Sequence, residues 1–247
     1  MPKFWTFRAA ADEQKTAELL LYGLISSTSW WGDEVTPKQF KQDLDALGDV
    51  DLIRVFINSD GGDLFAGQAI HSMLKRHKAQ IEVYIDGLAA SSASLVAMAG
   101  DVVRMPRNAM IMVHNPWVLA MGNAEELRKV ADDLDKAREG MIAAYEDKTH
   151  LDREKIIELL DAETWMTAEE AVDLGFADEV EQAKEVAASL DGSHLILNGQ
   201  RMDLSKYRRP PKLLVSPAKI QQPAAPPAAS VPRLDIYRRR LELAEVG

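Results

Sequence analysis

The chain has 247 residues, of which 47% are hydrophobic, and a formal net charge of −10 at pH 7. That length and apolar content suffice for one sizeable α/β core, and the absence of cysteine excludes disulfides, thiolate metal sites and a cysteine nucleophile. No stretch reaches the length of a membrane-spanning helix and the N-terminus lacks the apolar run of a signal peptide, so we expect a cytoplasmic protein without a membrane partner.

The first hundred residues alternate between predicted strands and predicted helices. Aliphatic and β-branched runs of strand length are separated by segments with helical spacing and helix-start signals. In chain order these are a strand at 19–25, a helix opening at Thr36–Pro37, a strand at 52–57, a helix at 64–77, a strand at 81–85 and a helix at 91–99. This alternation predicts repeated βαβ units and therefore an α/β fold with a mainly parallel sheet.

The strand at 52–57 runs into the turn Asn-Ser-Asp-Gly-Gly-Asp at 58–63. The pair Gly61–Gly62 allows the backbone to turn sharply and to bring an N–H group close to a bound molecule. An ordinary turn between a strand and a helix has the same pattern, so the glycines alone do not identify a site.

The run Gly-Leu-Ala-Ala-Ser-Ser-Ala-Ser at 87–94 places Ser91 where a strand becomes a helix. A serine at such a junction exposes its hydroxyl, and the free N–H groups of the first helical turn face whatever the hydroxyl attacks. That geometry suits a nucleophile. Small residues packed at a buried helix start produce the same pattern, so both interpretations remain open for this run alone.

His114 follows the predicted strand at 109–113 and precedes Asn115-Pro116, where the chain must leave the sheet. The other four histidines fall on a predicted helix or in polar, turn-like surroundings. His114 is therefore the candidate partner for a nucleophile at the end of a neighbouring strand.

The second half of the chain is predicted to be mainly helical. One long helix covers 123–148, where Asn123 and Glu126 have the spacing of a capping pair and apolar residues recur along one face. A second helix covers 153–160, and a third begins after Thr167 and ends at Gly175.

The sequence resembles the Clp protease proteolytic subunit family of serine peptidases over residues 16–180. Four elements in the same order carry the resemblance: Ile-Asn-Ser-Asp-Gly-Gly at 57–62, Gly-Leu-Ala-Ala-Ser at 87–91, Met-Val-His-Asn-Pro at 112–116, and Trp-Met-Thr-Ala-Glu-Glu-Ala at 165–171, which closes with Gly-Phe-Ala-Asp at 175–178. The resemblance implies the crotonase-like superfold of repeated ββα and βαβ units, with the long helix protruding from it.

Carried over residue by residue, the resemblance implies a serine–histidine–acid triad and an oxyanion hole. Ser91 becomes the nucleophile, His114 the general base, and the backbone N–H groups of Gly62 and Ser92 the oxyanion donors. The family's aspartate position holds Glu163, which can still accept the second imidazole N–H. Asp161 is the alternative acid, and a site without an acidic partner is the third reading. We expect no cofactor, and no metal, because Asp60 and Asp63 form only half of a metal site.

In the family the helix that corresponds to 123–148 interlocks with an opposing ring. The resemblance therefore implies a ring of identical subunits, either a heptamer or a stacked pair of heptamers. Without the family, a helix lying against its own domain is the simpler interpretation. A nucleic-acid partner is not expected, because the short basic clusters near the C-terminus lack an aromatic stacking platform.

Residues 1–180 are assigned to the peptidase domain and residues 181–247 to a tail. The tail is net basic, whereas the domain is net acidic, and residues 221–229 form a low-complexity, proline-rich linker. We expect this tail to be largely disordered, with an amphipathic helix at 234–245 that serves as a docking peptide.

A tail of this kind makes the chain similar to the Clp-related head maturation proteases of tailed bacteriophages and prophages. That similarity implies an endopeptidase that cleaves scaffold or major capsid protein inside the assembling prohead of a bacterial host, without an unfoldase, since its substrates are held nearby at high effective concentration. The alternative is a proteolytic subunit that serves an ATP-dependent Clp unfoldase. A crotonase-like acyl-CoA enzyme and a catalytically inactive structural ring are the remaining hypotheses.

Overall fold

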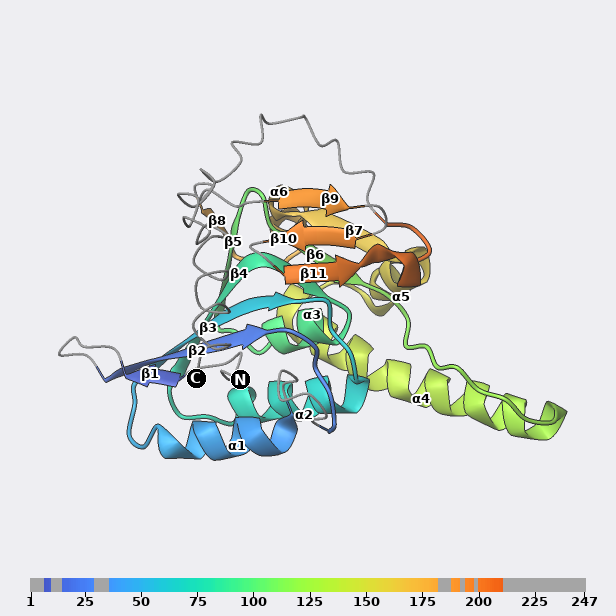
Figure 1. The fold of residues 1–247 in the computed structure, drawn as a ribbon, viewed down its shortest axis with the longest axis horizontal. Coiled ribbons are helices and arrows are strands. Elements are labelled where there is room, and N and C mark those ends of the chain that lie inside the picture. The colour runs from blue at the N-terminus through green and yellow to red at the C-terminus, as the bar shows by residue number, and fades with distance from the viewer. Residues whose placement is uncertain are drawn as a thin grey trace, which may run out of the picture. The chain divides into compact units, whose positions relative to one another are not determined.

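An eight-stranded sheet runs through the centre of the structure (Figure 1). The computed structural model describes residues 7–9, 15–28, 36–181, 188–191, 194–197 and 200–210, all within one unit of the chain, Met1–Lys212. The strands follow the order β1-β2-β3-β4-β5-β8, with β6 beside β4 and β7 beside β6. Their bounds are β1 Phe7–Ala9, β2 Thr16–Tyr22, β3 Leu52–Ser59, β4 Gln80–Ala90, β5 Val102–Pro106, β6 Met110–Val113, β7 Thr164–Thr167 and β8 Glu179–Glu181.

The sheet forks at the long strand β4. Glu82–Tyr84 of β4 pair with β5, whereas Leu88–Ala90 pair with β6, and both pairings are parallel. Near the end of β3, Ser59 pairs with Ala89 after a shift in register. The carboxyl ends of β3, β4 and β6 therefore meet at one edge, which is where parallel sheets commonly form their binding sites.

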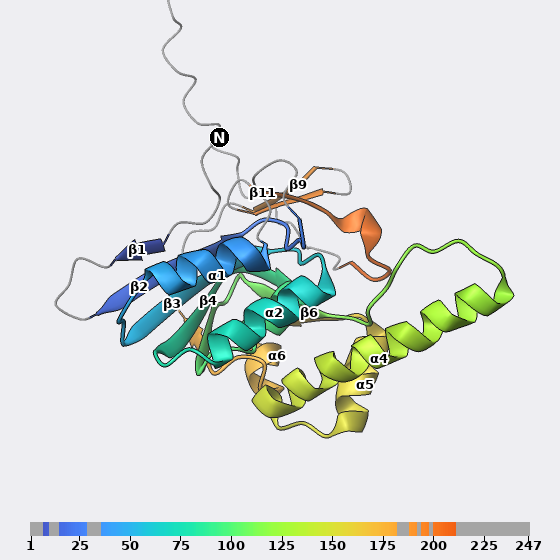
Figure 2. The same cartoon turned by 90° about the horizontal axis from the view of Figure 1, so that it is seen from below.

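Six helices are described: α1 Pro37–Ala46, α2 Leu64–Lys75, α3 Ser92–Ala97, α4 Ala124–Thr149, α5 Arg153–Ala162 and α6 Ala168–Asp173. Helices α1 and α2 cover the same face of the sheet (Figures 1 and 2). The predicted capping pairs at the start of α4 and of α6 are both formed as full capping boxes. Each box satisfies two otherwise unpaired N–H groups, and so defines where its helix begins.

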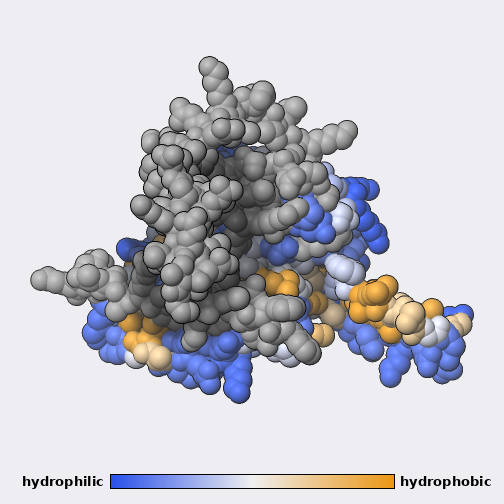
Figure 3. Space-filling view, viewed as in Figure 1, coloured by the Kyte–Doolittle hydropathy of each residue, from blue (hydrophilic) through white to orange (hydrophobic). Residues whose placement is uncertain are grey.

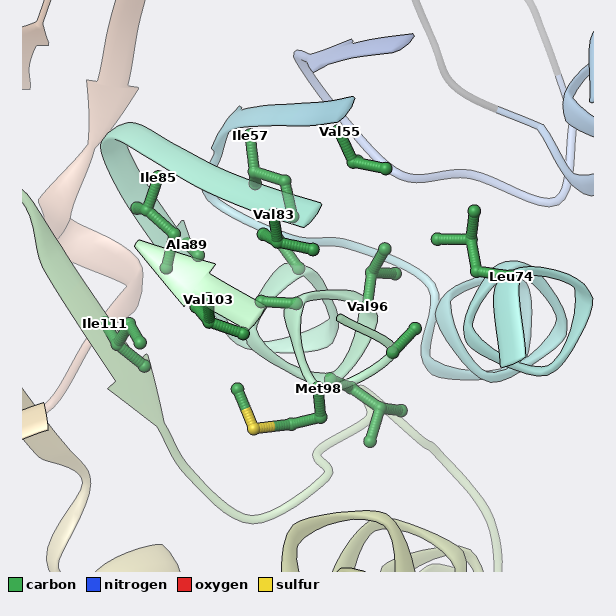
Figure 4. Packing of buried hydrophobic residues seen from close by; sticks show 14 of the residues in the cluster. Val55, Ile57, Leu74, Val83, Ile85, Ala89, Val96, Met98, Val103 and Ile111 are labelled. Carbon is green, nitrogen blue, oxygen red and sulfur yellow. The ribbon is translucent and has the colours of Figure 1, made fainter. Parts of the chain in front are cut away.

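The core lies between the sheet and the helices on this face. Alternate residues of β3 and β4 point toward α2 and α3, as the period of two along a strand requires. Figure 4 shows this packing, in which every labelled side chain is at most 2% exposed: Val55, Ile57, Leu74, Val83, Ile85, Ala89, Val96, Met98, Val103 and Ile111. Burial of such a side chain contributes about 1.5–3 kcal/mol for the larger residues, so the core holds β4 and α3 rigidly on either side of Ser91.

Helix α4 is packed into the core only in its C-terminal part. Its buried residues begin at Met141, whereas residues 124–140 are exposed or half-buried. Both ribbon views show the N-terminal half of α4 extending away from the sheet, with the chain that leaves β6 running out to its tip (Figures 1 and 2). Large apolar side chains remain exposed on this projection, and we call Trp117, Val118, Leu119, Met121 and Leu127 the apolar arm surface. Apolar side chains gather over the projecting part in Figure 3.

Regular structure continues past residue 180. Strands β9 Ala188–Asp191, β10 His194–Leu197 and β11 Gln200–Asp203 form a separate antiparallel sheet, and a 3-10 turn follows at Leu204–Lys206. Composition alone assigns this stretch to the disordered tail. The predicted linker at 221–229 and the predicted helix at 234–245 lie outside the described residues.

The predicted mixed α/β fold, with a mainly parallel sheet and one long helix, is confirmed. The first strand, in contrast, ends at Tyr22 and not at residue 25, because Gly23 turns the chain with a φ of 107°. Ile25 then forms an isolated bridge to Gly62. No helix in the described ranges is both long and apolar enough to span a bilayer.

Candidate active site

Ser91 occupies a strained turn between β4 and α3. Its φ of 56° and ψ of −128° lie in a region that non-glycine residues rarely adopt. The Ser91 N–H donates to the Met112 carbonyl at 2.9 Å, and the Ser91 carbonyl accepts from the Ser94 N–H at 3.0 Å. These bonds hold the turn and leave the Ser91 hydroxyl at the edge of the sheet, which is the geometry of a nucleophile elbow.

His114 reaches this hydroxyl because β4 and β6 are parallel. Ala90 pairs with Met112, so Ser91 and His114 each leave the same edge of the sheet within two residues of that pair. The distance from His114 Nε2 to Ser91 Oγ is 2.8 Å, which is a hydrogen-bond distance. His114 is only 9% exposed. An imidazole in this position can remove the hydroxyl proton and activate the serine.

The double-glycine turn packs against the Ser91 elbow. Gly61 and Gly62 have φ values of 88° and 143°. A Cβ on Gly61 would lie 2.7 Å from the Ser91 Cβ, and one on Gly62 would lie 1.9 Å from the Ile25 carbonyl oxygen. The buried Ser59 hydroxyl accepts the Gly61 N–H at 3.1 Å and so stabilises the turn. Only glycine permits this close approach on both sides.

Gly62 and Ser92 line the same cleft as Ser91 and His114. Ser92 is the first residue of α3, so its N–H has no acceptor within its own helix. Backbone N–H groups beside a nucleophile can stabilise the negative charge that develops on a carbonyl oxygen under attack. The structure thus brings four predicted residues around one cleft.

Glu163 directly precedes β7, the strand that pairs with β6. Strands β6 and β7 are antiparallel, and their last pair joins Val113 to Thr164, so His114 and Glu163 are the next residues on the two segments. The residue ends α5 in a left-handed conformation, with φ 50°. Its carboxylate accepts the backbone N–H groups of Arg208 at 3.0 Å and of Arg209 at 2.6 Å.

Asp161, the alternative acid, contacts the residue next to His114. Its Oδ1 accepts from Asn115 Nδ2 at 2.7 Å and from an Arg138 guanidinium nitrogen at 2.8 Å. Asp161 is therefore part of an ion pair with α4, and it lies beside the site.

Tyr207 is a residue of this site that the sequence does not reveal. Its ring meets those of Trp165 and His114 edge-on, with centroids 5.1 Å and 6.2 Å apart, and its hydroxyl donates to the Asp60 carbonyl at 3.0 Å. Burial raises the pKa of the Tyr207 hydroxyl, and the nearby Asp60 raises it further, so the group stays neutral and able to donate. No motif marks Tyr207, and it lies outside the family resemblance.

A cleft of about 560 Å³ opens over Ser91 and His114. The apolar face of α4 forms part of its lining, through Val130, Leu134, Ala137 and Met141. Among the described residues that line it, the charged ones are the carboxylates Asp60, Asp63 and Asp133. No group of three His, Asp or Glu side chains in the described part of the chain is arranged to hold a metal ion.

A comparison with protein families identifies the family to which this chain belongs. The family model described as Clp protease matches residues 33–184. The chain belongs to the Clp protease family. It is therefore a serine peptidase, and its α/β fold with a long helix is consistent with that family.

Two curated relatives of this Clp protease are bacterial. The ATP-dependent Clp protease proteolytic subunit of Bacteroides thetaiotaomicron is 30% identical over 153 residues, which cover 60% of this chain and 70% of the relative. The protein of the same name from Deinococcus radiodurans is 32% identical over 146 residues, which cover 58% of this chain and 71% of the relative. All the predicted site residues fall within the family match, whereas Tyr207 lies beyond it.

Proposed function

We propose that Ser91 is the nucleophile and His114 the general base of this Clp protease. The observation that carries the proposal is the 2.8 Å distance between His114 Nε2 and Ser91 Oγ at a strained elbow. A backbone held in a costly conformation beside a buried histidine is typical of a catalytic site and serves no evident packing purpose.

The reaction follows from these positions. Ser91 Oγ attacks the peptide carbonyl carbon while its proton passes to His114 Nε2, and the carbonyl oxygen becomes an oxyanion that the amides of Gly62 and Ser92 stabilise. The C–N bond then breaks, and His114 returns the proton to the leaving amine. Water, activated by the same imidazole, releases the acyl group from Ser91.

Glu163 is the acid that we assign to the triad. The antiparallel register of β6 and β7 supports this choice, since His114 and Glu163 are the residues next to its last pair, Val113 with Thr164. A carboxylate here orients the imidazole and stabilises the imidazolium that forms during attack. Asp161 is the weaker candidate, because it lies two residues further from the last pair of β6 and β7 and forms an ion pair with Arg138 on α4.

The cleft favours extended peptide segments with apolar side chains. Its α4 face is aliphatic, and its charged lining residues Asp60, Asp63 and Asp133 are acidic. Apolar contact supplies most of the binding free energy in such a cleft, whereas an acidic substrate segment would be repelled. The proposed substrates therefore carry apolar residues near the cleaved bond and neutral or basic residues around them.

Labelling with a fluorophosphonate probe tests the assignment. The probe should form a covalent adduct on Ser91 that mass spectrometry locates, and both the adduct and peptide hydrolysis should disappear in Ser91→Ala. Correctly assembled wild-type protein that hydrolyses peptides but carries the adduct on another residue would reject Ser91 as the nucleophile.

For the biological role we propose head maturation in a tailed bacteriophage or prophage, with scaffold or capsid precursor as substrate. The support is the long segment, residues 185–247, that follows the family match, together with the basic, proline-rich composition of its later part. Such an enzyme would act inside the assembling prohead of a bacterial host, where the high local concentration of substrate replaces an unfoldase.

A specific observation favours a second role. Both relatives are named ATP-dependent Clp protease proteolytic subunits, so this chain is also a candidate partner of a Clp unfoldase. In either role we propose a ring of identical subunits, a heptamer or two stacked heptamers. The apolar arm surface supports assembly, because exposed apolar side chains that cluster in this way mark interaction surfaces.

One experiment separates the two roles. Purified protein is given a folded model substrate with and without a Clp unfoldase and ATP, and in parallel a phage scaffold or capsid precursor alone. Cleavage of the precursor without ATP supports head maturation, whereas degradation that requires the unfoldase and ATP supports the second role. Analytical ultracentrifugation of the same sample measures the subunit number.

A further inference from the structure

The segment Asp203–Pro210, which we call the strap, lies beyond the family match at residue 184 yet packs against the active site. Leu204 and Tyr207 are only 6% and 7% exposed. The Asp203 side chain caps the 3-10 turn by accepting the Ser205 N–H at 2.9 Å. The Asp203 cap thus shapes the turn, while the buried side chains of Leu204 and Tyr207 anchor the strap.

Tyr207 contacts three segments that carry proposed catalytic groups. Its hydroxyl donates to the carbonyl of Asp60, which directly precedes the double-glycine turn. Its ring meets His114 at the end of β6 and Trp165 on β7. It also lines the cleft together with Ser91. The Tyr207 side chain therefore connects the double-glycine turn, the proposed general base His114 and the wall of the cleft.

The two residues after Tyr207 bind the proposed acid. The backbone N–H groups of Arg208 and Arg209 donate to different oxygens of the Glu163 carboxylate, and an Arg209 guanidinium nitrogen donates to the Ala162 carbonyl at 3.1 Å. Hydrogen bonds to a carboxylate are roughly twice as strong as neutral ones. A carboxylate has about four acceptor sites, so these two donors restrict its rotation and still leave acceptor capacity for an imidazole.

We propose that Tyr207 is a positioning residue for His114, and that the strap is a working part of this active site. The proposal rests on the assignment of His114 and Glu163 in the proposed function. The Tyr207 ring limits the movement of the imidazole and walls one side of the cleft, while the amides of Arg208 and Arg209 hold the Glu163 carboxylate. This protein therefore needs a segment from outside its family domain to orient its catalytic groups.

Full-length Tyr207→Ala and Tyr207→Phe test the ring. We expect kcat for a short fluorogenic peptide to fall about tenfold in Tyr207→Ala, since small displacements of catalytic groups have effects of this size or larger. The acid limb of the pH profile of kcat/KM should also lie at a different pH from that of the wild type. Tyr207→Phe retains the ring and should recover most of the kcat and the wild-type profile. Tyr84→Ala and Tyr84→Phe are the matched controls, because Tyr84 is a half-buried tyrosine of β4, seven residues before Ser91, and should not change the profile.

A second pair of variants tests the strap amides. Arg209→Ala and Arg209→Pro both lose the guanidinium, but only proline removes the N–H that binds Glu163. We expect Arg209→Pro to have a kcat about tenfold below that of Arg209→Ala. This pair keeps the proposal testable if Tyr207→Ala does not fold.

The outcomes separate this proposal from the proposed function. Unchanged kcat and pH profiles in folded Tyr207→Ala would overturn the positioning role of Tyr207. Equal kcat in the two Arg209 variants would overturn the role of the strap amides, and both results would leave the Ser91 adduct intact. A faster Tyr207→Ala would also overturn the positioning role of Tyr207, since that result means the strap obstructs the cleft. Loss of the Ser91 adduct in wild-type protein would instead contradict the proposed function itself.

Discussion

His114 and Glu163 are the two residues next to the last pair of β6 and β7, which joins Val113 to Thr164. The strands bring the two backbones together, but the left-handed conformation of Glu163 and the strap determine where its carboxylate is held. The carboxylate that we propose as the acid is therefore positioned by main-chain donors from residues 45 and 46 positions further along the chain.

Replacement of Glu163 should lower kcat strongly. In Glu163→Ala the imidazole loses the group that fixes its tautomer, so we expect kcat to fall by roughly 10²–10⁴-fold with a smaller change in KM. Asp161→Ala, which removes the ion pair with Arg138 and the hydrogen bond from Asn115, should stay within a few-fold of wild type. Steady-state hydrolysis of a fluorogenic peptide measures both, and unchanged turnover in Glu163→Ala would reject the assignment.

The strain at Ser91 should be visible in stability. A non-glycine residue at φ 56° and ψ −128° costs on the order of 1–3 kcal/mol, and glycine adopts positive φ with little penalty. Ser91→Gly should therefore be more stable than Ser91→Ala by about 1 kcal/mol, although both lose the nucleophile. Urea unfolding compares them, and equal midpoints would show that the Ser91 turn is not strained.

Gly62→Ala should distort the double-glycine turn. The new Cβ would lie 1.9 Å from the Ile25 carbonyl oxygen, so the turn must move and the Gly62 N–H must move with it. We expect kcat to fall by roughly 10²–10³-fold, the typical effect of losing one oxyanion donor. Gly48→Ala is the control, because Gly48 also has a positive φ of 68° but no atom within 4 Å of the added Cβ. A Gly62→Ala enzyme with wild-type kcat would remove Gly62 from the mechanism.

Stability should decrease as the pH is lowered from about 6.5 to 4. Burial lowers the pKa of His71 on α2 to about 4, with Lys75 lowering it further and Asp147 opposing the shift. Between pH 6.5 and pH 4 the unfolded chain binds a proton at His71 that the folded chain does not. The free energy of unfolding therefore decreases as the pH is lowered, by roughly 1–3 kcal/mol for His71. Below pH 4 both states are protonated and the loss from His71 is complete.

Chemical denaturation at several pH values measures this dependence. His71→Asn should show a smaller fall in unfolding free energy between pH 6.5 and 4.5 than the wild type. The exposed His150 at the end of α4 provides the control variant His150→Asn, because asparagine tolerates its left-handed conformation. Identical pH dependence in wild type and His71→Asn would contradict the prediction.

Local patterns in the sequence identify the elements that carry Ser91, His114 and the double glycine. Strand and helix periodicity, capping pairs and glycine turns act within a few residues, and the matching helices α2 and α4 begin within one residue of their predicted starts. Strand bounds are less accurate. The first strand lies at Thr16–Tyr22 and not at 19–25, since the turn at Gly23 depends on its pairing with the segment around Gly62. Strand β4 continues to Ala90, whereas the predicted strand ends at residue 85.

By itself the sequence determined the family, the α/β class and the order of the proposed catalytic residues, because these are written in local patterns and in four ordered motifs. Only the tertiary structure decided where the Glu163 carboxylate is held and that Tyr207 lies beside His114. Tyr207 and Asp60 are 147 residues apart, and no propensity or spacing encodes a contact of that range. It forms because the chain returns over the sheet edge and buries an aromatic ring there, and that burial depends on the packing of the whole unit.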